Sequence, residues 1–500
     1  MQGQGCSRVL HTLGALQFPG SGDWIGDKPA ERVLFAIRMR VHTSAVTMMR
    51  PEIRSFLAGA LSAGVLATAL GAQRAVNMTA MHDDIERRTL AVMPKVIGWR
   101  RDIHEHPELS GDEVRTSALV AAHLRALGME VQTEIGGMHG VVGILRGGKP
   151  GPVVALRADM DALPVGEQVD LPFKSKVTST YRGQAVGVMH ACGHDNHVAI
   201  LMGAAEVLAG MKATLPGTVK FFFQPAEEGA PNGGGGAEPM IRAGVLQNPK
   251  VDAVFGLHVF PGSVGSIGYR VGPLLAAANS WSLTVRGRQT HGAAPWAGVD
   301  PIVVGSQIVM GLQTIISRQT DITAVPAIVT VGAINGGIRN NIIPDSVMMI
   351  GTIRTFDATQ RADIFARMKR TAEQIALASG ATAAFSVDSG YPVTVNDTAL
   401  TNQMLPTLRW AAGASGVGIR ALVTGAEDFS YFQEKVPGVF VMLGVTPKDK
   451  DPRTVAANHS PYFFADETAL PNGVRAMAGL AVDFLASGRV ASGATGASGR

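Results

Sequence analysis

The sequence predicts an α/β fold in which a mostly parallel sheet forms the larger domain and a ferredoxin-like domain of βαββαβ order is inserted into it. Three observations lead to this prediction. Apolar runs of strand length alternate with helical patterns before residue 275 and again after residue 392, which is typical of parallel sheets. Between these two points the pattern changes to the βαββαβ order. Apolar residues make up 46% of the 500 residues and charged residues 17%, which is enough to fill the cores of two or three domains.

The larger domain is expected in two parts. In the first part, helical periodicity covers 84–106 and 112–127, and the second of these helices ends at Gly128. A further helix is expected at 195–210, and apolar runs typical of strands lie at 131–135, 141–146, 153–158, 218–224 and 253–258. In the second part the expected elements are a helix at 397–413, a strand at 439–444 and a last helix at 466–487.

The inserted domain is expected between residues 275 and 391. Its four strands are predicted at 280–287, 327–333, 346–355 and 382–388. Its two helices are predicted at 300–318 and 358–379, so that each half of the domain contains one helix between strands.

The two ends of the chain differ in composition from the rest. Residues 1–47 show no sustained periodicity, so we expect this stretch to be disordered or to precede the true start of translation. Residues 48–72 combine a basic start, an apolar run from Phe56 to Ala72 and small closing residues, which together are typical of a signal peptide. This predicts a periplasmic or secreted protein, and the alternatives are a retained anchor or an ordinary apolar helix in a cytoplasmic protein. The tail at 489–500 is rich in Ser, Gly and Ala and is expected to be disordered.

Charge, hydropathy and cysteine content argue against several classes of protein. The formal net charge is only +4 and the basic residues are scattered, which gives no support to nucleic-acid binding. Apart from 56–72, no stretch is long and apolar enough to suggest a membrane span, so we expect no membrane partner once the leader is removed. The two cysteines, Cys6 and Cys192, are too few for a disulfide framework. Cys192 is therefore a buried thiol, a nucleophile or a metal ligand.

Polar side chains gather where the predicted strands end or where a helix begins. They are Asp159 and Asp161, Glu227 and Glu228, His258 at the close of its strand, His459 after a long loop, and Cys192 and His194 ahead of the helix at 195–210. Because ligands of open α/β sheets bind beyond the carboxyl ends of the strands, we expect these side chains to converge on one site.

The residue types in this group point to a metal site. Cys192 and His194 are two residues apart, a spacing that lets both side chains bind one ion in an extended turn. A thiolate with an imidazole suits zinc or another later first-row metal, and carboxylates and further histidines would complete a site for one or two divalent ions. The adjacent pair Glu227 and Glu228 fits a division of labour. One carboxylate would bind metal while the other acts as general base for a water whose pKa the metal lowers to about 7.

The sequence resembles the amidohydrolase family of hippurate hydrolases, plant indole-acetyl-amino-acid hydrolases and bacterial N-acyl-amino-acid amidohydrolases, which are relatives of the aminoacylase and carboxypeptidase metallo-enzymes. The resemblance covers roughly residues 85–488. It rests on the motifs Arg157-Ala158-Asp159-Met160-Asp161-Ala162-Leu163-Pro164, Cys192-Gly193-His194-Asp195 with His197, Gln224-Pro225-Ala226-Glu227-Glu228-Gly229, Gly256-Leu257-His258, Asn340-Asn341-Ile342-Ile343-Pro344-Asp345, Gly425-Ala426-Glu427-Asp428-Phe429 and Asn458-His459-Ser460.

The resemblance implies a role for each member of the polar group. It identifies the ligands of one or two divalent ions (zinc, manganese or cobalt) as Cys192, His194, Glu228, His258 and His459. Glu227 is implied as the general base and later as the proton donor to the leaving amine. Asp161 is implied as a carboxylate that orients the site, and the role of Asp159 stays open.

The resemblance also implies a homodimer and a place for the substrate. His291 in the inserted domain is similar to the histidine that reaches a partner subunit's active site and stabilises the tetrahedral oxyanion. Asn341 and Arg354 resemble the residues that hold the substrate carboxylate or carbonyl. On this basis 84–274 and 392–488 are the two parts of the catalytic domain, and 275–391 is the lid or dimerisation domain. The sequence departs from the family at Met189, where glycine is common, and in the extended glycine run from Gly233 to Gly236.

The leading prediction is therefore metal-dependent hydrolysis of the amide bond of a small N-acyl amino acid. One alternative is a metallo-carboxypeptidase or dipeptidase acting on short peptides. A second alternative makes Cys192 a covalent nucleophile with His190 or His194 as its base, which would leave the Glu pair without a task. A third is a metal-binding protein without catalysis.

Overall fold

The computed structural model describes residues 51–230, 233–388 and 390–488, and it describes side chains from residue 78 onward. Contacts divide the chain into two units, Met1–Arg74 and Ala75–Arg500, and the second contains every element discussed below except the start of the first helix. The predicted disordered ends lie outside the described residues. The predicted leader falls partly on a helical backbone, whose side chains are not described. Within the described ranges, no helix combines the length and apolar character needed to cross a membrane.

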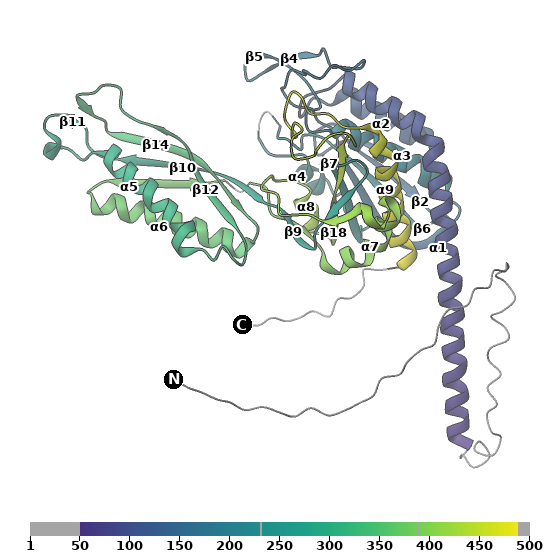
Figure 1. Cartoon of the computed structure of the whole chain (residues 1–500). Helices are drawn as coiled ribbons and strands as arrows, with labels where there is room; N and C mark the ends of the chain where they lie inside the picture. The colour runs from purple at the N-terminus through teal and green to yellow at the C-terminus, as the bar shows by residue number, and fades with distance from the viewer. Residues whose placement is uncertain (1–50, 231–232, 389, 489–500) are drawn as a thin grey trace, which may run out of the picture. The chain divides into compact units, whose positions relative to one another are not determined.

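An eight-stranded sheet forms the centre of the larger domain (Figure 1). Its strands, in spatial order, are β1 (Glu130–Ile135), β2 (Gly140–Arg146), β6 (Pro216–Gln224), β3 (Lys149–Asp159), β7 (Ala253–Ser263), β18 (Gly438–Thr446), β8 (Ile267–Tyr269) and β17 (Val417–Ile419). The central strands β6, β3, β7 and β18 are mutually parallel, whereas β1 and β2 are joined antiparallel at one side. The prediction of a mostly parallel sheet is confirmed.

Helices cover both faces of this sheet. On one face lie the part of α1 (Pro51–Glu105) that begins at Met78, α2 (Val114–Ala126), α3 (His194–Gly210), α7 (Thr398–Ala412) and α9 (Leu470–Ser487), and on the other α4 (Ala237–Arg242) and α8 (Ser430–Gln433). Alternate residues of β3 enter the two cores, so Leu156 packs with the first group and Ala155 with the second. Burial on both faces explains why the central strands are continuous apolar runs rather than alternating patterns.

The inserted domain has the predicted ferredoxin-like order. It consists of β10 (Ala277–Arg286), α5 (Pro301–Thr314), β12 (Ala327–Asn335), β14 (Ser346–Thr355), α6 (Ala358–Ala378) and β15 (Thr382–Val387). The antiparallel sheet has the order β12-β14-β10-β15, and its core joins Leu283 of β10 to Ile308 of α5 and Met368 of α6. Asp300 and Asp357 cap the two helices by accepting backbone N–H groups of their first turns.

The remaining elements are short. They are β4 (Thr178–Tyr181), β5 (Gln184–Gly187), β9 (Gly272–Leu275), β11 (Thr290–His291), β13 (Ile342–Ile343), β16 (Thr394–Asn396), three 3₁₀ turns (Pro295–Ala297, Ala414–Gly416 and Glu467–Ala469) and one π-helical turn (Ile315–Gln319). The strands among them are too short to show a period in the sequence, and none was predicted.

Several predicted boundaries are wrong. The helix expected to begin at residue 84 is part of α1, which begins at Pro51, and the last helix begins at Leu470 rather than at 466 because a 3₁₀ turn precedes it. The helix expected at 300–318 is α-helical only to Thr314 and continues as the π-helical turn. The strand expected to close at His258 continues to Ser263, because β18 pairs with β7 as far as Ser263. The other neighbour, β3, pairs with β7 only as far as Gly256. His258 therefore lies inside a strand but beyond the last residue of β7 that pairs with β3, where a side chain can reach the carboxyl edge of the sheet.

The central position of β3 generates a test of the fold. Leu156 is fully buried in β3, so Leu156→Ala should lower the free energy of unfolding by about 2–5 kcal/mol through lost burial and a residual cavity. The same substitution at Leu90, which is 58% exposed on α1, should change it by no more than about 0.5 kcal/mol. Urea denaturation followed by circular dichroism measures both, and equal losses would contradict the described packing.

Candidate metal centre

Cys192 and His194 are positioned by the turn that begins α3. Between them, Gly193 has a φ of 92° and is the N-cap residue of the helix. A Cβ atom on Gly193 would lie 2.4 Å from Cγ2 of Val259, so both the backbone conformation and the space require glycine. The turn leaves Sγ of Cys192 3.3 Å from Nε2 of His258. The predicted convergence of β7 with the start of α3 is thus present in the structure.

The Glu pair follows β6 in a strained turn. Ala226 has a φ of 53°, a conformation that non-glycine residues rarely adopt. Its N–H donates to Oε1 of Glu113 at 2.8 Å, and the same oxygen accepts the N–H of Gly111 at 2.9 Å. Glu113 is fully buried and lies in the segment just before α2. This carboxylate therefore holds the turn that presents Glu227 and Glu228, a role that sequence reasoning missed.

His459 reaches the site from the loop after β18. Its backbone also has a positive φ, 71°, and its N–H donates to the carbonyl of Ala191 at 2.8 Å. The preceding residue, Asn458, donates from Nδ2 to the carbonyls of Cys192 and Val259, at 2.9 and 3.1 Å. These bonds fix the His459 loop against the Cys192 turn.

Asp161 connects two of the predicted ligands. Its Oδ1 lies 3.1 Å from Nδ1 of His194, and its Oδ2 accepts the backbone N–H of Glu228 at 2.9 Å and the hydroxyl of Ser110 at 2.6 Å. The bond to Nδ1 sets the ring of His194 so that Nε2 is the unprotonated nitrogen of the neutral form. A carboxylate in this position is the usual support of a metal-binding histidine.

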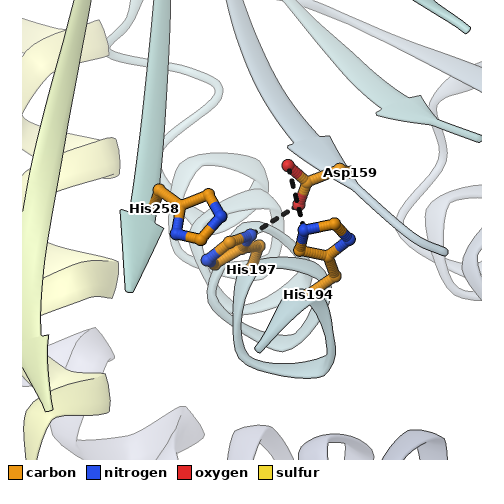
Figure 2. Close-up of side chains that lie close together, drawn as sticks. All are labelled: Asp159, His194, His197 and His258. Atoms are coloured by element: carbon orange, nitrogen blue, oxygen red, sulfur yellow. Dashed lines mark hydrogen bonds and ion pairs between the residues drawn. The ribbon is translucent and has the colours of Figure 1, made fainter. Parts of the chain in front are cut away.

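Figure 2 shows His194 and His258 beside two other candidates, His197 and Asp159. His197 uses both ring nitrogens: Nδ1 lies 2.5 Å from Oδ1 of Asp159, and Nε2 accepts the N–H of Val259 at 2.8 Å. Asp159 also accepts Nη1 of Arg157 at 2.6 Å. Because their polar atoms are already bonded within the protein, His197 and Asp159 support the site rather than bind an ion.

Two of the predicted ligands, in contrast, keep atoms available. Nε2 of His194 and Oε1 of Glu228 are buried and have no hydrogen-bond partner in the described part of the chain. Nε2 of His459 lies 2.9 Å from the same Oε1, without the alignment of a hydrogen bond. Ligand atoms of Cys192, Glu228 and His459 all lie within 4.8 Å of one another, and so do those of His194, Glu227 and Glu228. Sulfur, imidazole and carboxylate atoms at these separations fit divalent zinc or a later first-row metal.

A buried guanidinium, that of Arg157, joins three carboxylates near the predicted ligands. Arg157 donates to Asp159 and to Oδ1 of Asp428 at 2.8 Å, and its Nη2 lies 2.9 Å from Oε1 of Glu427. Gln224, the last residue of β6, donates from Nε2 to both carboxylate oxygens of Asp428 at 2.8 Å. Arg157 thus ties the ends of β3 and β6 to the Gly425–Phe429 motif, whose role sequence reasoning did not assign.

The electrostatic balance of the pocket is negative. Burial and the neighbouring carboxylates of Glu427, Glu228 and Asp428 raise the pKa of Glu227 well above its usual value. Burial opposes the charged form of His194, but Asp159 and Asp161 outweigh it and raise the pKa of that ring to about 10. Such a pocket attracts cations.

The same environment is unfavourable to a cysteine nucleophile. Burial raises the pKa of the Cys192 thiol well above its usual value, and the carboxylates of Glu228 and Glu227 add to the effect. A nucleophilic cysteine needs the opposite shift, because the thiolate is the reactive form. A bound cation would stabilise that thiolate as a ligand.

A cavity of about 750 Å³ opens over these side chains. Cys192, Glu227, His258 and His459 line it together with Arg354, which stands at the end of β14. The size suits a small-molecule substrate. Of the residues predicted to contact the substrate, Arg354 lines this cavity.

His291 and Asn341 do not line this cavity. Both are exposed in the inserted domain, where His291 pairs with Ile342 and the carbonyl of Asn341 accepts the N–H of Gly292 at 2.8 Å. Nδ1 of His291 accepts the N–H of Ala293 at 2.9 Å, so the proton of the neutral ring is on Nε2. The described chain brings these two residues near each other but not to the candidate metal ligands.

Comparisons with known proteins show the family to which this chain is similar. The family described as Peptidase family M20/M25/M40 matches residues 155–483. Thermostable carboxypeptidase 1 of Saccharolobus solfataricus is 44% identical over 78% of this chain and 95% of its own length. IAA-amino acid hydrolase ILR1-like 4 of Arabidopsis thaliana is 39% identical over 78% of this chain and 86% of its own. The crystal structure of the Bacillus subtilis YXEP protein, titled a dinuclear metal binding peptidase from the M20 family, matches with a TM-score of 0.66 at 38% identity, covering 79% of this chain and 99% of that one.

The bonds of Asp161 generate a test of the site. In Asp161→Asn, the amide nitrogen would face either the ring N–H of His194 or the donors from Ser110 and Glu228, so one ligand would lose its orientation. We expect zinc affinity to fall about 10–100-fold, as measured by competition with a chelating dye. Asp449→Asn, on an exposed loop, is the matched control and should bind zinc like the parent protein. Unchanged affinity in folded Asp161→Asn would contradict the role given to this carboxylate.

Proposed function

The chain belongs to peptidase family M20/M25/M40 and is a hydrolase that acts on amides, and from this we propose that it hydrolyses N-acyl amino acids with the aid of two divalent ions. The observation that carries the proposal is the set of available ligand atoms around the cavity beside Glu227. The residues that would hold the ions are Cys192, His194, Glu228, His258 and His459. The dinuclear description of the Bacillus subtilis relative supports two ions rather than one.

When bound, the ions supply Lewis acidity toward the scissile carbonyl and make water easier to deprotonate. Glu227 precedes the proposed ligand Glu228 in the chain and lines the cavity. We assign it the removal of a proton from the attacking water. The same proton then passes from Glu227 to the leaving amine nitrogen as the C–N bond breaks, which releases a carboxylic acid and an amino acid. Burial and nearby carboxylates, which favour a held proton, suit this second step.

Arg354 is the proposed anchor for the substrate carboxylate. Its Nη1 donates to Thr352 Oγ1 and to the carbonyl of Ile353, and in the described residues no carboxylate lies within ion-pair distance of the guanidinium. An arginine fork binds a carboxylate through two parallel hydrogen bonds. This anchor would favour amides that stand beside a free carboxylate.

His291 is proposed to act across a homodimer. The Nε2–H of its neutral ring is directed away from the backbone that fixes Nδ1, which suits donation to an oxyanion. Because His291 and Asn341 do not line the cavity of their own chain, a partner subunit would supply them. An inserted domain that dimerises fits this arrangement.

A carboxypeptidase acting on short peptides is the second candidate. The 44% identical relative is named a carboxypeptidase, and a peptide with a free carboxyl end presents the same amide beside a carboxylate. Hydrolysis of benzoyl amino acids and of dipeptides, compared at equal concentration, decides between the two substrate classes.

The role of Glu227 is tested by Glu227→Gln. This change keeps the size of the side chain but removes the base, so kcat on a benzoyl amino acid should fall by at least about 10²–10⁴-fold. Metal content, measured by atomic emission, should stay at the parent value because Glu227 is not a proposed ligand.

Glu434→Gln, an exposed glutamate on the same domain, is the control and should retain parental kcat. Parental turnover in Glu227→Gln would exclude it as the base. Turnover that survives complete chelation of the parent protein would refute the metal-dependent proposal as a whole.

The action of His291 across a dimer is tested by mixing two inactive variants. His291→Ala and Glu227→Ala subunits that reassociate should form mixed dimers, each with one intact composite site. An equal mixture should then recover about a quarter of the parental activity, since half of the dimers are mixed. Verified mixed dimers without activity would show that His291 does not act in trans.

A further inference from the structure

Arg420 is a cation without an acidic partner at the wall of the reaction cavity. It follows β17 and is half-buried, and burial lowers the pKa of its guanidinium. Its Nη2 donates to the carbonyl of Pro261 at 3.3 Å. Across the residues that the structure describes, no aspartate or glutamate forms an ion pair with it. A half-buried charge of this kind is costly unless a ligand neutralises it.

The backbone of Arg420 is held by hydrogen bonds through both its N–H and its carbonyl. Its backbone N–H donates to the carbonyl of Tyr269 at 2.7 Å, and its own carbonyl accepts Nη1 of Arg270 at 3.2 Å. The side chain then crosses Gly268, where an added Cβ atom would lie 3.1 Å from Cδ of Arg420. The absence of a side chain at Gly268 is therefore what lets Arg420 lie flat along β8.

Arg420 lines two neighbouring cavities. The reaction cavity of about 750 Å³ and a smaller cavity of about 220 Å³ share Phe260, Pro261 and Arg420 in their walls. The smaller one is bounded by β8 and β17 and by Met442 of β18. A short substrate side chain that enters the smaller cavity from the reaction cavity would pass Arg420.

The carboxylates that line the reaction cavity do not neutralise the charge of Arg420. Oε1 of Glu427 is already paired with Arg157 at 2.9 Å, and Glu228 is a proposed metal ligand. Arg354 lies in the same cavity and suffices for one substrate carboxylate. A second unpaired guanidinium therefore indicates a second anionic group on the ligand.

We propose that Arg420 and the smaller cavity form a subsite for an acidic amino-acid side chain, so that the enzyme prefers N-acyl derivatives of glutamate or aspartate. This inference rests on the proposed function, in which Arg354 binds the α-carboxylate. The guanidinium of Arg420 binds the side-chain carboxylate as a charge-assisted pair, whereas an amide side chain of the same shape leaves the cation without a counter-charge.

The test compares N-benzoyl-glutamate with N-benzoyl-glutamine on the metal-loaded protein. The parent should favour the glutamate derivative by at least about tenfold in kcat/KM, mainly through KM, since tenfold corresponds to a modest net ion-pair contribution. Arg420→Met should lose this preference by reducing kcat/KM for the glutamate derivative alone. Gly268→Ala should weaken the preference in the same direction by displacing Arg420. Arg453→Met removes an exposed arginine paired with Asp451 and should leave both values unchanged.

Two results would overturn the inference. One is a parent protein with the same kcat/KM for the two substrates, and the other is an Arg420→Met variant in which kcat/KM falls equally for both. Binding of the same two compounds to Glu227→Gln, measured by calorimetry, distinguishes failure of this inference from failure of the proposed function. If neither compound is hydrolysed by the parent but the glutamate derivative binds better and only with Arg420 present, the subsite stands and the reaction is wrong. If both are hydrolysed without preference, the reaction stands and the subsite is wrong.

Discussion

The structure depends on a concentration of buried carboxylates that follow the parallel strands β3 and β6 and the Gly425–Phe429 motif. Buried carboxylates need partners of opposite charge. The protein provides such partners for some of these carboxylates and not for others. Arg157 forms ion pairs with Asp159, Glu427 and Asp428 and thereby offsets part of their negative charge. In the described part of the chain, Glu227 has no ion pair, and Glu228 is paired only with the ring of His459. Divalent cations would complete this balance, which is why the arrangement is best understood as a metal centre.

The fold makes that concentration possible by covering both faces of the sheet and leaving its carboxyl edge for polar groups. β3 stops at Asp159 while β7 runs on to Ser263, and His258 lies beyond the last residue of β7 that pairs with β3. The turn at Gly193 and the strained Ala226 bring side chains from two other connections to the same point. Where the chain returns from the inserted domain, the hydroxyl of Tyr391 donates to the carbonyl of Glu227 at 2.7 Å, so the proposed base is also held from that side.

Much of this could be predicted from the sequence, and the limits have physical causes. The parallel sheet and the βαββαβ insert follow from long apolar periods, whereas strands of two to four residues such as β8 and β17 carry no period to detect. The polar residues at strand ends were predicted to converge because the edge of a parallel sheet is shared. The pairing of Arg157 with Asp428 was not predicted, since 271 residues separate them and only the folded chain brings them together. Glu113 was missed for the same reason, and Arg420 has no local pattern that sets it apart. The expectation that His258 ends its strand failed because β18 continues to pair with β7 as far as Ser263, beyond the last pair of β7 with β3 at Gly256.

The central claim is that Cys192 binds metal while the chemistry belongs to Glu227, and X-ray absorption at the zinc edge tests it most directly. In zinc-loaded, active protein the account predicts one sulfur neighbour at about 2.3 Å among nitrogen and oxygen neighbours at about 2.0–2.2 Å. The sulfur should be absent in Cys192→Ser and unchanged in Glu227→Gln. A purely nitrogen and oxygen shell in active parent protein would contradict the assignment of Cys192 as a ligand.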